Sequence, residues 1–350
     1  MLFRQLFDRV SSTYSYLLAD ETTRTALLID CVYERHARDA ALIRELGLTL
    51  AATVDTHCHA DHVTGAWLMQ QALGSQILLS GAYGAEHVDR TLSDGDTVQF
   101  GNATLEVRAT PGHTDGCLSF VTADRRMLFS GDALLVRGAG RTDFQNGDAE
   151  RLFHSIRERL FTLPDDCAVY PAHDYDGRTS STILEERRFN PRIGGDARQE
   201  DFVGYMHNLV LPHPKQLDVA VPANLRSGKP DGATQPQTPA WGPIVVTYAG
   251  IPEVDPEWVA RHRQAVSLLD VRSSSELSGE FGRLEDALSI PLDQLRARLD
   301  DVPSDKPVVT VCQTGKRSAM ASQILSAAGR RDVASLAGGM LRWRELELPS

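Results

Sequence analysis

The stretch DTHCHADH, residues 55–62, follows the short apolar segment LTLAATV and carries His57, His59, Asp61 and His62 at positions i, i+2, i+4 and i+5. Imidazole is a borderline nitrogen donor and carboxylate a hard, charged oxygen donor, so this group suits a divalent metal. Taken alone, the stretch is compatible with one metal ion, two, or none. The reaction it serves depends on residues farther along the chain.

Three more potential ligands each follow an apolar segment expected to form a strand. They are His113 in TPGHTDG, Asp132 in FSGDALL and His173 in PAHDYDG. The first part of the chain alternates such strands with few helices, which predicts a layered α/β domain. Loops at strand ends commonly carry functional residues, so we expect the seven His and Asp side chains to meet at one sheet edge.

The composition bounds the kind of protein. With 350 residues, 42% apolar and 24% charged, the chain suits two soluble domains. Its net charge of −11 argues against nucleic acid and against a membrane as partners. The five scattered cysteines do not suggest a disulfide framework, and we find neither a secretory signal nor an apolar run of membrane-spanning length. A cytoplasmic enzyme is therefore expected.

A segment rich in Pro and Gly divides the chain. Residues 229–243 lack apolar periodicity and are predicted to be a linker between domains at 1–228 and 244–350. After it, strands expected at 244–250, 267–271 and 307–312 alternate with helices expected at 256–264, 293–299 and 318–329. This βαβ alternation predicts a small parallel α/β domain.

The second domain has its own chemical feature, Cys312 at the end of the apolar segment VVTV. The loop CQTGKR then leads into a helix expected to begin near Ser318. Backbone N–H groups of such a loop form an anion-binding nest, and the helix N-terminus and two cations add positive charge. Together they favour thiolate over thiol, so we expect Cys312 to be a nucleophile. The loop residues involved are Gln313, Thr314, Gly315, Lys316 and Arg317.

The motifs HCHADH, GH, SGD and AH, in this order, resemble the metallo-β-lactamase superfamily, over about residues 1–228. The resemblance implies an αββα sandwich with metal between its sheets. TPGHTDGCLSF, GRTDFQNGD and PAHDYDGR are similar to glyoxalase II and to the related persulfide dioxygenases. The stretch 207–228 resembles the dioxygenases more than the longer helical domain of glyoxalase II.

These two relatives imply different metal sites. The dioxygenase resemblance implies one Fe(II) per chain bound by His57, His113 and Asp132, with His59, Asp61, His62 and His173 as a supporting shell or a vacant second metal site. Glyoxalase II implies two zinc ions held by all seven residues, with Asp132 bridging. The same resemblance places Arg141, Tyr175 and Arg192 at the glutathione site. Asp55 is a further candidate for orienting a histidine ligand.

The second half resembles the rhodanese homology domain over about residues 244–350. LLDVRSSSELSGE, ALSIPL, CQTGKRS and LAGGMLRW appear in that family's order. The resemblance implies sulfur transfer through a persulfide on Cys312. Cysteine phosphatases use a related loop that is one residue longer, with Arg six positions after Cys, whereas Arg317 lies five positions after Cys312.

Together the two resemblances imply a bifunctional enzyme of sulfur metabolism. The iron domain would oxidise glutathione persulfide with O₂ to sulfite and glutathione, and the rhodanese domain would transfer sulfur between thiosulfate and glutathione. The alternative is a binuclear zinc thioester hydrolase of glyoxalase II type with a rhodanese sulfur-carrier or regulatory domain. The oligomeric state stays open, with a homodimer among the options.

Overall fold

The structure is a computed structural model that describes residues 1–209, 216–230 and 241–349. Its contacts divide the chain into two compact units, Met1–His36 with Leu46–Asp231 and Ala37–Glu45 with Gly232–Ser350. Most of the predicted linker, and residues 210–215 of the stretch compared with the dioxygenases, lie outside the described residues. The domain boundaries at 228 and 244 therefore remain a prediction.

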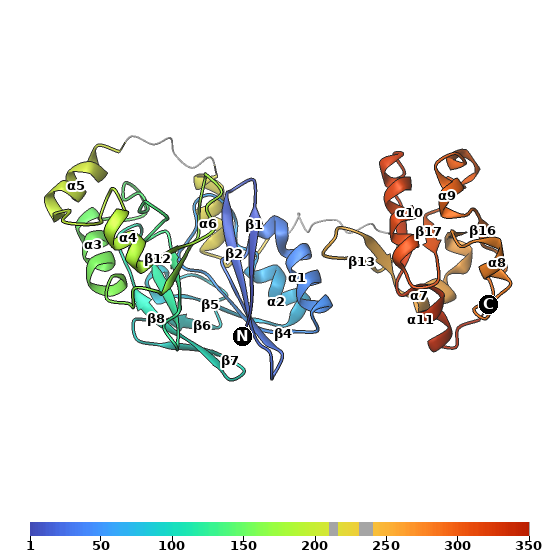
Figure 1. The fold of residues 1–350 in the computed structure, drawn as a ribbon, viewed down its shortest axis with the longest axis horizontal. Coiled ribbons are helices and arrows are strands. Elements are labelled where there is room, and N and C mark those ends of the chain that lie inside the picture. The colour runs from blue at the N-terminus through green and yellow to red at the C-terminus, as the bar shows by residue number, and fades with distance from the viewer. Residues whose placement is uncertain (210–215, 231–240, 350) are drawn as a thin grey trace. The chain divides into compact units, whose positions relative to one another are not determined.

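The first unit is built on two six-stranded sheets, with strand orders β1-β2-β3-β4-β5-β6 and β12-β11-β10-β9-β8-β7 (Figure 1). The first sheet comprises β1 (Leu2–Asp8), β2 (Thr13–Asp20), β3 (Thr25–Ile29), β4 (Thr49–Val54), β5 (Gln76–Ser80) and β6 (Arg90–Leu92). The second comprises β7 (Thr97–Phe100), β8 (Ala103–Ala109), β9 (Leu118–Thr122), β10 (Met127–Gly131), β11 (Ala168–Pro171) and β12 (Ser181–Thr182).

One apolar core lies between the two sheets. Leu27 and Ile29 of β3 point to the same face because side chains alternate along a strand, and they pack in one cluster with Phe120 of β9 and Phe129 of β10. These side chains are almost completely removed from water. The sandwich therefore buries one face of each sheet against the other.

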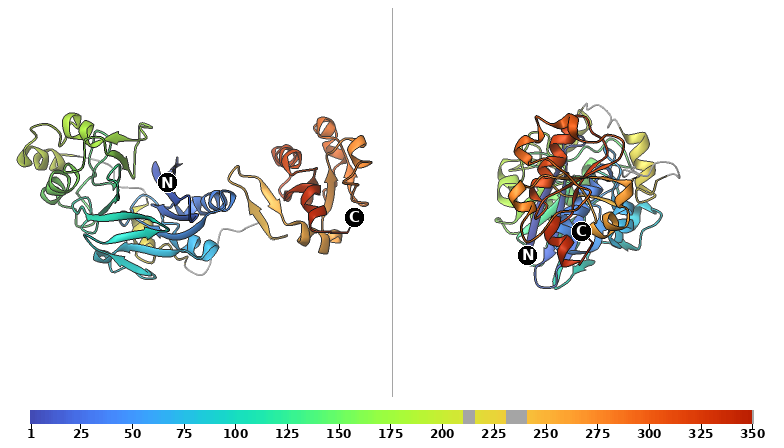
Figure 2. Two further views of the ribbon diagram at one scale, coloured as in Figure 1. Left: turned by 60° about the horizontal axis from the view of Figure 1, so that its bottom comes forward. Right: turned by 90° about the vertical axis from the view of Figure 1, so that its right-hand side faces the viewer.

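Helices cover the outer face of the second sheet, as Figure 2 shows for the green and yellow-green segments. Val121, Leu128 and Val169 of that sheet share a buried cluster with Leu152 and Phe202 of the helices. The helices are α3 (Ala149–His154), which continues as a π-helical turn over Ser155–Leu160, α4 (Ile183–Phe189) and α5 (Gln199–His207). Helix α2 (Ala66–Leu73) packs on β4 and β5 of the first sheet, so the αββα expectation is confirmed.

Several short elements were not predicted from the pattern. Strands β1, β6 and β7 have mixed exposure and lie at or near sheet edges. Edge strands carry polar residues on their open side, so they lack the apolar run that marks a central strand. Helix α6 (Leu217–Asn224) was likewise not predicted, whereas the helix that the sequence pattern indicates over residues 36–47 is present as α1 (His36–Glu45).

The second unit is a six-stranded sheet of order β13-β14-β18-β17-β15-β16, parallel except for β13. Val308 and Val309 of β17 enter different clusters, one with Leu325 of α10 and the other with Trp343 of α11. Both faces are therefore covered by helices, as expected for a parallel sheet. Its elements are β13 (Ile244–Val246), β14 (Pro252–Val254), α7 (Pro256–Arg261), β15 (Ser267–Asp270), α8 (Ser274–Leu277), β16 (Leu288–Ser289), α9 (Leu292–Leu295), β17 (Val308–Val311), α10 (Lys316–Ala327), β18 (Val333–Leu336) and α11 (Gly339–Glu345).

Helix α10 begins at Lys316, not near Ser318 as the sequence suggested. Gly315 precedes it with φ of 88°, a left-handed conformation that a side chain would disfavour. This turn lets the chain enter the helix two residues early. Lys316 and Arg317 are consequently in the first helical turn.

Candidate functional sites

Strand ends bring the predicted metal ligands of the first unit together. Strands β10 and β11 are parallel, so their carboxyl ends lie at one edge, and His173 Nδ1 comes to 2.7 Å from Asp132 Oδ1. The start of β2 reaches the same edge, where Thr13 pairs with His173 in an antiparallel bridge. The seven predicted residues fall into two groups of potential ligand atoms, each group within 4.8 Å.

The first group consists of His57, His113 and Asp132. His113 Nδ1 donates to the Arg141 carbonyl at 2.6 Å, and His57 Nδ1 lies 3.0 Å from the Thr56 hydroxyl. Both rings are thus anchored through Nδ1, which leaves Nε2 for a metal. His113 Nε2 and Asp132 Oδ2 are 3.7 Å apart, too far for a hydrogen bond. The donor set and this spacing fit a divalent ion.

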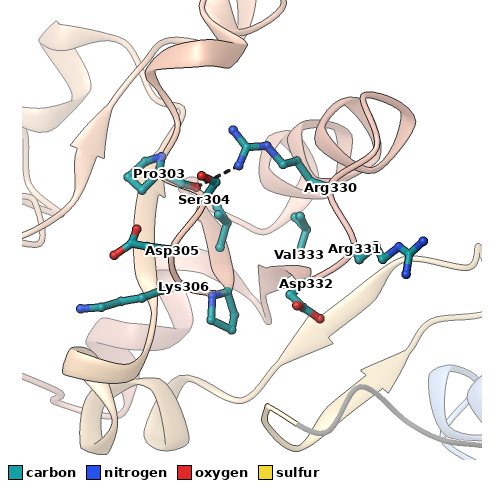
Figure 3. A pocket seen from close by; sticks show the side chains of 10 residues that line it. Pro303, Ser304, Asp305, Lys306, Arg330, Arg331, Asp332 and Val333 are labelled. Carbon is teal, nitrogen blue, oxygen red and sulfur yellow. Dashed lines mark hydrogen bonds between the residues drawn. The ribbon is translucent and has the colours of Figure 1, made fainter.

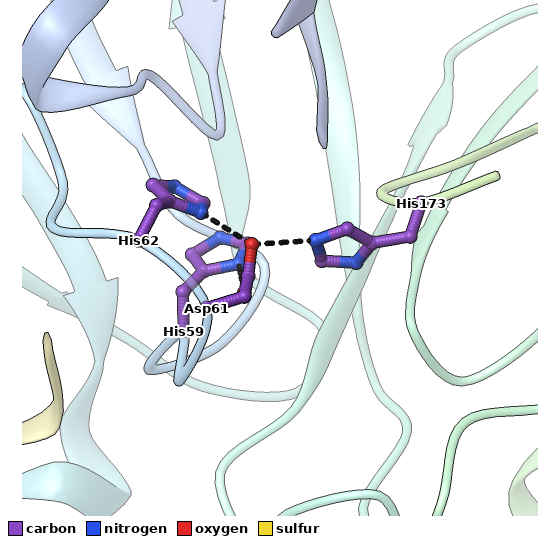
Figure 4. A group of neighbouring side chains, drawn as sticks. All are labelled: His59, Asp61, His62 and His173. Atoms are coloured by element: carbon purple, nitrogen blue, oxygen red, sulfur yellow. Dashed lines mark hydrogen bonds and ion pairs between the residues drawn. The ribbon is translucent and has the colours of Figure 1, made fainter. Parts of the chain in front are cut away.

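The second group consists of His59, Asp61, His62 and His173 (Figure 4). Here the side chains bond to one another: Asp61 Oδ2 lies 2.9 Å from His62 Nδ1 and 2.9 Å from His173 Nε2. Two ring nitrogens, His59 Nδ1 and His62 Nε2, are buried without a hydrogen-bond partner among the described residues. All four residues can ligate, yet the carboxylate is already hydrogen-bonded.

Burial and neighbouring charges give the imidazoles of the two groups different pKa values. Burial lowers the pKa of His57 and of His59 well below the usual range, so both rings are neutral and keep a lone pair. Burial alone would lower the pKa of His173 as well, but the carboxylates of Asp132 and Asp61 raise it well above its usual value. The two carboxylates thus favour a protonated His173 ring, which lies 2.7 Å from Asp132 and 2.9 Å from Asp61.

Two functional residues were missed by sequence reasoning, Asp30 and Thr13. Asp30 accepts from the Thr56 amide at 2.6 Å, and its Oδ1 lies 3.2 Å from His59 Nε2. The orienting role considered for Asp55 is thus held by Asp30. Burial, followed by the charge of Asp30, raises the pKa of Asp55 to about 7. The available signal was that Asp30 directly follows the apolar segment TALLI, as the predicted ligands follow theirs.

The residues predicted for glutathione lie around the first group. Arg141 offers its carbonyl to His113 and pairs its guanidinium with Asp143 at 2.6 Å. Arg192 donates to the Ala139 carbonyl at 2.6 Å, so it contacts the same loop. Tyr175 is 74% exposed, and its ring stacks on His173 with centroids 6.2 Å apart. Arg141 therefore contacts the first group, Arg192 contacts the loop beside it, and Tyr175 contacts the second group.

Three cysteines of the first unit, Cys58, Cys117 and Cys167, are buried, and their thiols are poor nucleophiles. Burial raises the pKa of Cys58 and of Cys117 to about 12. Burial also raises the pKa of Cys167 to about 11. These thiols stay protonated near neutral pH, so the Cys within DTHCHADH belongs to the packing of the motif.

In the second unit, Cys312 follows β17 and its side chain is buried. Helix α11 holds the backbone of the loop through two hydrogen bonds. The Met340 amide donates to the Cys312 carbonyl at 2.8 Å, and the Leu341 amide donates to the Gln313 carbonyl at 2.8 Å. Cys312 Sγ lies 3.4 Å from the Ser318 hydroxyl. The loop residues Gln313, Thr314 and Gly315 lead from the thiol into α10.

The two cations of the loop have different surroundings. Arg317 forms a two-point pair with Glu276 at 2.7 and 2.5 Å, which holds its guanidinium at α8. The hydrogen bonds from Arg317 are the main cause that lowers the pKa of Glu276 to about 2. Lys316 is exposed on the first turn of α10. The two cations therefore do not add equal positive charge to the cysteine loop. Lys316 faces solvent, and the charge of Arg317 is balanced by Glu276.

A buried ion pair braces the strand next to the loop. Arg272 Nη2 lies 2.6 Å from Asp270 Oδ2, both side chains are at most 2% exposed, and Arg272 also donates to the Gly282 carbonyl at 2.8 Å. Replacing Asp270 by alanine leaves a buried guanidinium without its carboxylate. We expect the local free energy of unfolding to fall by about 3–5 kcal/mol. Native-state hydrogen exchange at the amides of β15 and β17 measures it.

The matched control is the exposed pair of Arg342 and Glu345, 3.1 Å apart with both side chains about half exposed. Arg342→Ala is expected to change the same free energy by less than about 1 kcal/mol, because exposed pairs are weak. Equal effects of the two variants would contradict a special contribution of the buried pair.

A pocket of about 160 Å³ in the second unit lies away from this chemistry (Figure 3). It is bordered by Pro307 and Val308 at the start of β17 and by Val333 at the start of β18, whereas Cys312 follows the other end of β17. Arg330, at its rim, donates to the Val302 carbonyl at 2.8 Å. The pocket is thus separate from the cysteine loop.

No helix within the described ranges is long and apolar enough to cross a membrane. Two family models match the chain: the metallo-beta-lactamase superfamily over residues 8–173 and the rhodanese-like domain over residues 255–346.

Three relatives are informative. The human protein named persulfide dioxygenase ETHE1, mitochondrial, is 55% identical over 229 residues, which are 65% of this chain and 89% of that protein. A hydroxyacylglutathione hydrolase from Brucella ovis is 32% identical over 218 residues, 62% of this chain and 83% of that one. The crystal structure of ETHE1 from Myxococcus xanthus superposes with a TM-score of 0.63 at 49% identity, covering 65% of this chain and 100% of that one. Motifs, sandwich fold and these similarities agree, and the chain belongs to the persulfide dioxygenase family of the metallo-beta-lactamase superfamily, with a C-terminal rhodanese-like domain in addition.

Proposed function

We propose that the first unit oxidises glutathione persulfide with O₂. One persulfide, one O₂ and one water give one glutathione, one sulfite and two protons, so the terminal sulfur is oxidised and O₂ is reduced. The observation that carries this proposal is the 55% identity to the human persulfide dioxygenase over 89% of its length. The test is O₂ uptake by the iron-loaded chain with glutathione persulfide as substrate.

We assign one ferrous ion to His57, His113 and Asp132. When bound, ferrous iron supplies the redox chemistry between O₂ and sulfur, and two imidazoles with one carboxylate leave positions open for both. His173 holds Asp132 Oδ1 at 2.7 Å, so a single carboxylate oxygen is directed to the metal position. The hydrogen bonds within the second group favour one metal, because its carboxylate is engaged with His62 and His173.

Glutathione recognition is assigned to Arg141, Tyr175 and Arg192. Cations beside the metal loop suit the carboxylates of glutathione, since charge-assisted hydrogen bonds to carboxylates are strong and directional. Arg141 lies closest in structure to the metal group, because its own carbonyl anchors His113. The exposed Tyr175 phenol can hydrogen-bond the substrate near its sulfur.

We assign sulfur transfer between thiosulfate and glutathione to the second unit. The Cys312 thiolate attacks the outer sulfur of thiosulfate, sulfite leaves with the S–S electron pair, and Cys312 carries a persulfide. A glutathione thiolate then attacks the outer sulfur, which regenerates Cys312 and gives glutathione persulfide, the substrate of the first unit. The direction of net transfer follows the thiol and sulfite concentrations.

The alternative function is thioester hydrolysis by two zinc ions, with the second unit as a sulfur carrier or regulatory domain. The 32% identity to a hydroxyacylglutathione hydrolase and the full set of seven ligands support it. Metal analysis separates the two proposals: about one iron with O₂ uptake, or two zinc with thioester hydrolysis.

The Ser318 hydroxyl is expected to stabilise the Cys312 thiolate. It lies 3.4 Å from Sγ and 2.8 Å from the Ser335 hydroxyl, which can donate to it, and its own proton, donated to the Gly315 carbonyl at 3.0 Å, can turn to a thiolate. A hydrogen bond to a charged group contributes about 1.5–3 kcal/mol, so Ser318→Ala should slow sulfur transfer from thiosulfate to glutathione by about tenfold or more.

Ser322→Ala is the matched control for this measurement. Its hydroxyl lies one turn farther along α10 and donates to the Ala319 carbonyl at 2.8 Å. Sulfur transfer should keep the wild-type rate in this variant. An unchanged rate in Ser318→Ala would refute the role of that hydroxyl.

A further inference from the structure

The Thr13 hydroxyl lies in the middle of the second group of ligands, although no motif of the sequence includes it. Thr13 Oγ1 is 3.1 Å from Asp61 Oδ2, 3.3 Å from His62 Nδ1 and 3.1 Å from His173 Nε2. The side chain is completely buried. One hydroxyl therefore contacts three of the four residues that would hold a second metal.

Strand pairing places this hydroxyl. Thr13 begins β2, and its bridge with His173 is continued by the Tyr14 amide, which donates to the Ala172 carbonyl at 2.7 Å. The Ser11 hydroxyl, 2.7 Å from Thr13 Oγ1, donates in turn to Asp8 at 2.8 Å. Asp8 is held by Arg35 at 2.6 Å. The Thr13 side chain is thus fixed from its own strand and from the opposite sheet.

We propose that the Thr13 hydroxyl closes the second group to a metal ion and so restricts the chain to one metal. A tetrahedral ion with bonds of about 2.1 Å keeps its ligand atoms about 3.4 Å apart. Asp61 Oδ2 lies only 2.9 Å from each of His62 and His173, so the group is contracted by direct hydrogen bonds. Thr13 Oγ1 joins this set of hydrogen bonds, because it lies 3.1–3.3 Å from Asp61, His62 and His173.

A role for Thr13 as a fourth ligand is less consistent with these contacts. A neutral hydroxyl is a weak ligand for transition metals beside imidazole and carboxylate. Its distances of 3.1–3.3 Å to the three neighbours are those of hydrogen bonds. The inference rests on the proposed one-iron function, and it assigns to Thr13 the restriction to a single metal ion.

The closed group also has a consequence for the first group. His173 is held by Asp61 and Thr13 through Nε2 and by Asp132 through Nδ1. The His173 ring is therefore held in place by the second group, and it in turn holds the Asp132 carboxylate of the first group. Thr13 acts as a positioning residue through this ring.

The test counts metal ions in the full chain rather than activity. Protein stripped with a chelator is loaded with excess Co(II) and desalted, and cobalt is measured by mass spectrometry together with its visible absorption. We expect about one cobalt per chain in the wild type and about two in Thr13→Ala, because alanine removes the hydroxyl and opens the group. Thr13→Ser keeps the hydroxyl and should bind about one.

Thr53→Ala is the matched control, since it removes a buried hydroxyl of β4 that donates to the Gln76 carbonyl at 3.4 Å. It should bind the wild-type amount. About one cobalt in a folded Thr13→Ala, or about two in the wild type, would overturn the proposal. If Thr13→Ala does not fold, Ser11→Ala replaces it: release of Thr13 should raise cobalt above the wild-type value, and an unchanged value overturns the proposal.

These outcomes are independent of the proposed reaction. Active O₂ uptake by the wild type together with one cobalt in Thr13→Ala would reject the role of Thr13 and leave the dioxygenase proposal standing. A gain of cobalt in Thr13→Ala without any O₂ uptake by the iron-loaded wild type would do the reverse.

Discussion

Replacing His113 by alanine is expected to lower iron-dependent O₂ uptake with glutathione persulfide by more than about 100-fold. Loss of an outer-shell partner typically costs roughly 10- to 100-fold in metal affinity or activity, and a direct ligand should cost more. His113 is anchored to the Arg141 carbonyl at 2.6 Å and faces Asp132 Oδ2, so no neighbouring imidazole of its group can replace it without moving this loop. Iron per chain, measured on the same samples, should fall in parallel.

His154→Ala is the control for this experiment. That imidazole is half exposed and pairs with Glu158 on the surface at 2.8 Å, so its loss should leave iron content and O₂ uptake at the wild-type level. Undiminished uptake in a folded, iron-depleted His113→Ala protein would contradict the assigned ligand set. Two tightly bound zinc ions and thioester hydrolysis in the wild type would support the alternative function instead.

Replacing Cys312 by serine is expected to reduce sulfur transfer from thiosulfate to glutathione by on the order of 10³-fold or more, as for other lost nucleophiles. A serine oxygen does not form the persulfide that carries the sulfur, and a hydroxyl is hardly ionised near neutral pH. The substitution is nearly isosteric, and the Ser318 hydroxyl 3.4 Å away can hydrogen-bond the new oxygen after a small shift. Loss of transfer would therefore report chemistry and not folding.

The two active-site variants control for each other. Cys312→Ser should keep O₂ uptake when glutathione persulfide is supplied, and His113→Ala should keep sulfur transfer. Detection of sulfite from both assays, and of a persulfide on Cys312 by mass spectrometry, completes the comparison. Transfer that survives in Cys312→Ser would show that another group is the nucleophile.

The sequence was most informative where function demands particular residue types at strand ends. The central strands are apolar and the ligands follow them directly, so the edge at which His57, His113 and Asp132 meet could be predicted. The parallel sheet of the second unit was equally predictable, because its βαβ alternation forces strand ends to one side. Short edge strands such as β1 and β7 were not, since their stability comes from pairing and not from their own pattern.

The beginning of α10 shows the same limit on a smaller scale. Its sequence allowed a start at Ser318, but the left-handed turn at Gly315 and the clamp from α11 on Cys312 and Gln313 decide for Lys316. Tertiary contacts of the loop thus overrode a local preference. They also paired Arg317 with Glu276, a residue 41 positions earlier in the chain.

What the sequence determined by itself is the chemistry available: seven potential metal ligands, one cysteine in a loop predicted to bind anions, and the order of strands that carries them. Tertiary structure alone decided how that chemistry is divided. The pairing of β2 with the loop after β11 places Thr13 against His173, and the parallel neighbours β3 and β4 place Asp30 against His59. Hydrogen bonds between residues so far apart in the chain follow from sheet register, which no local pattern encodes.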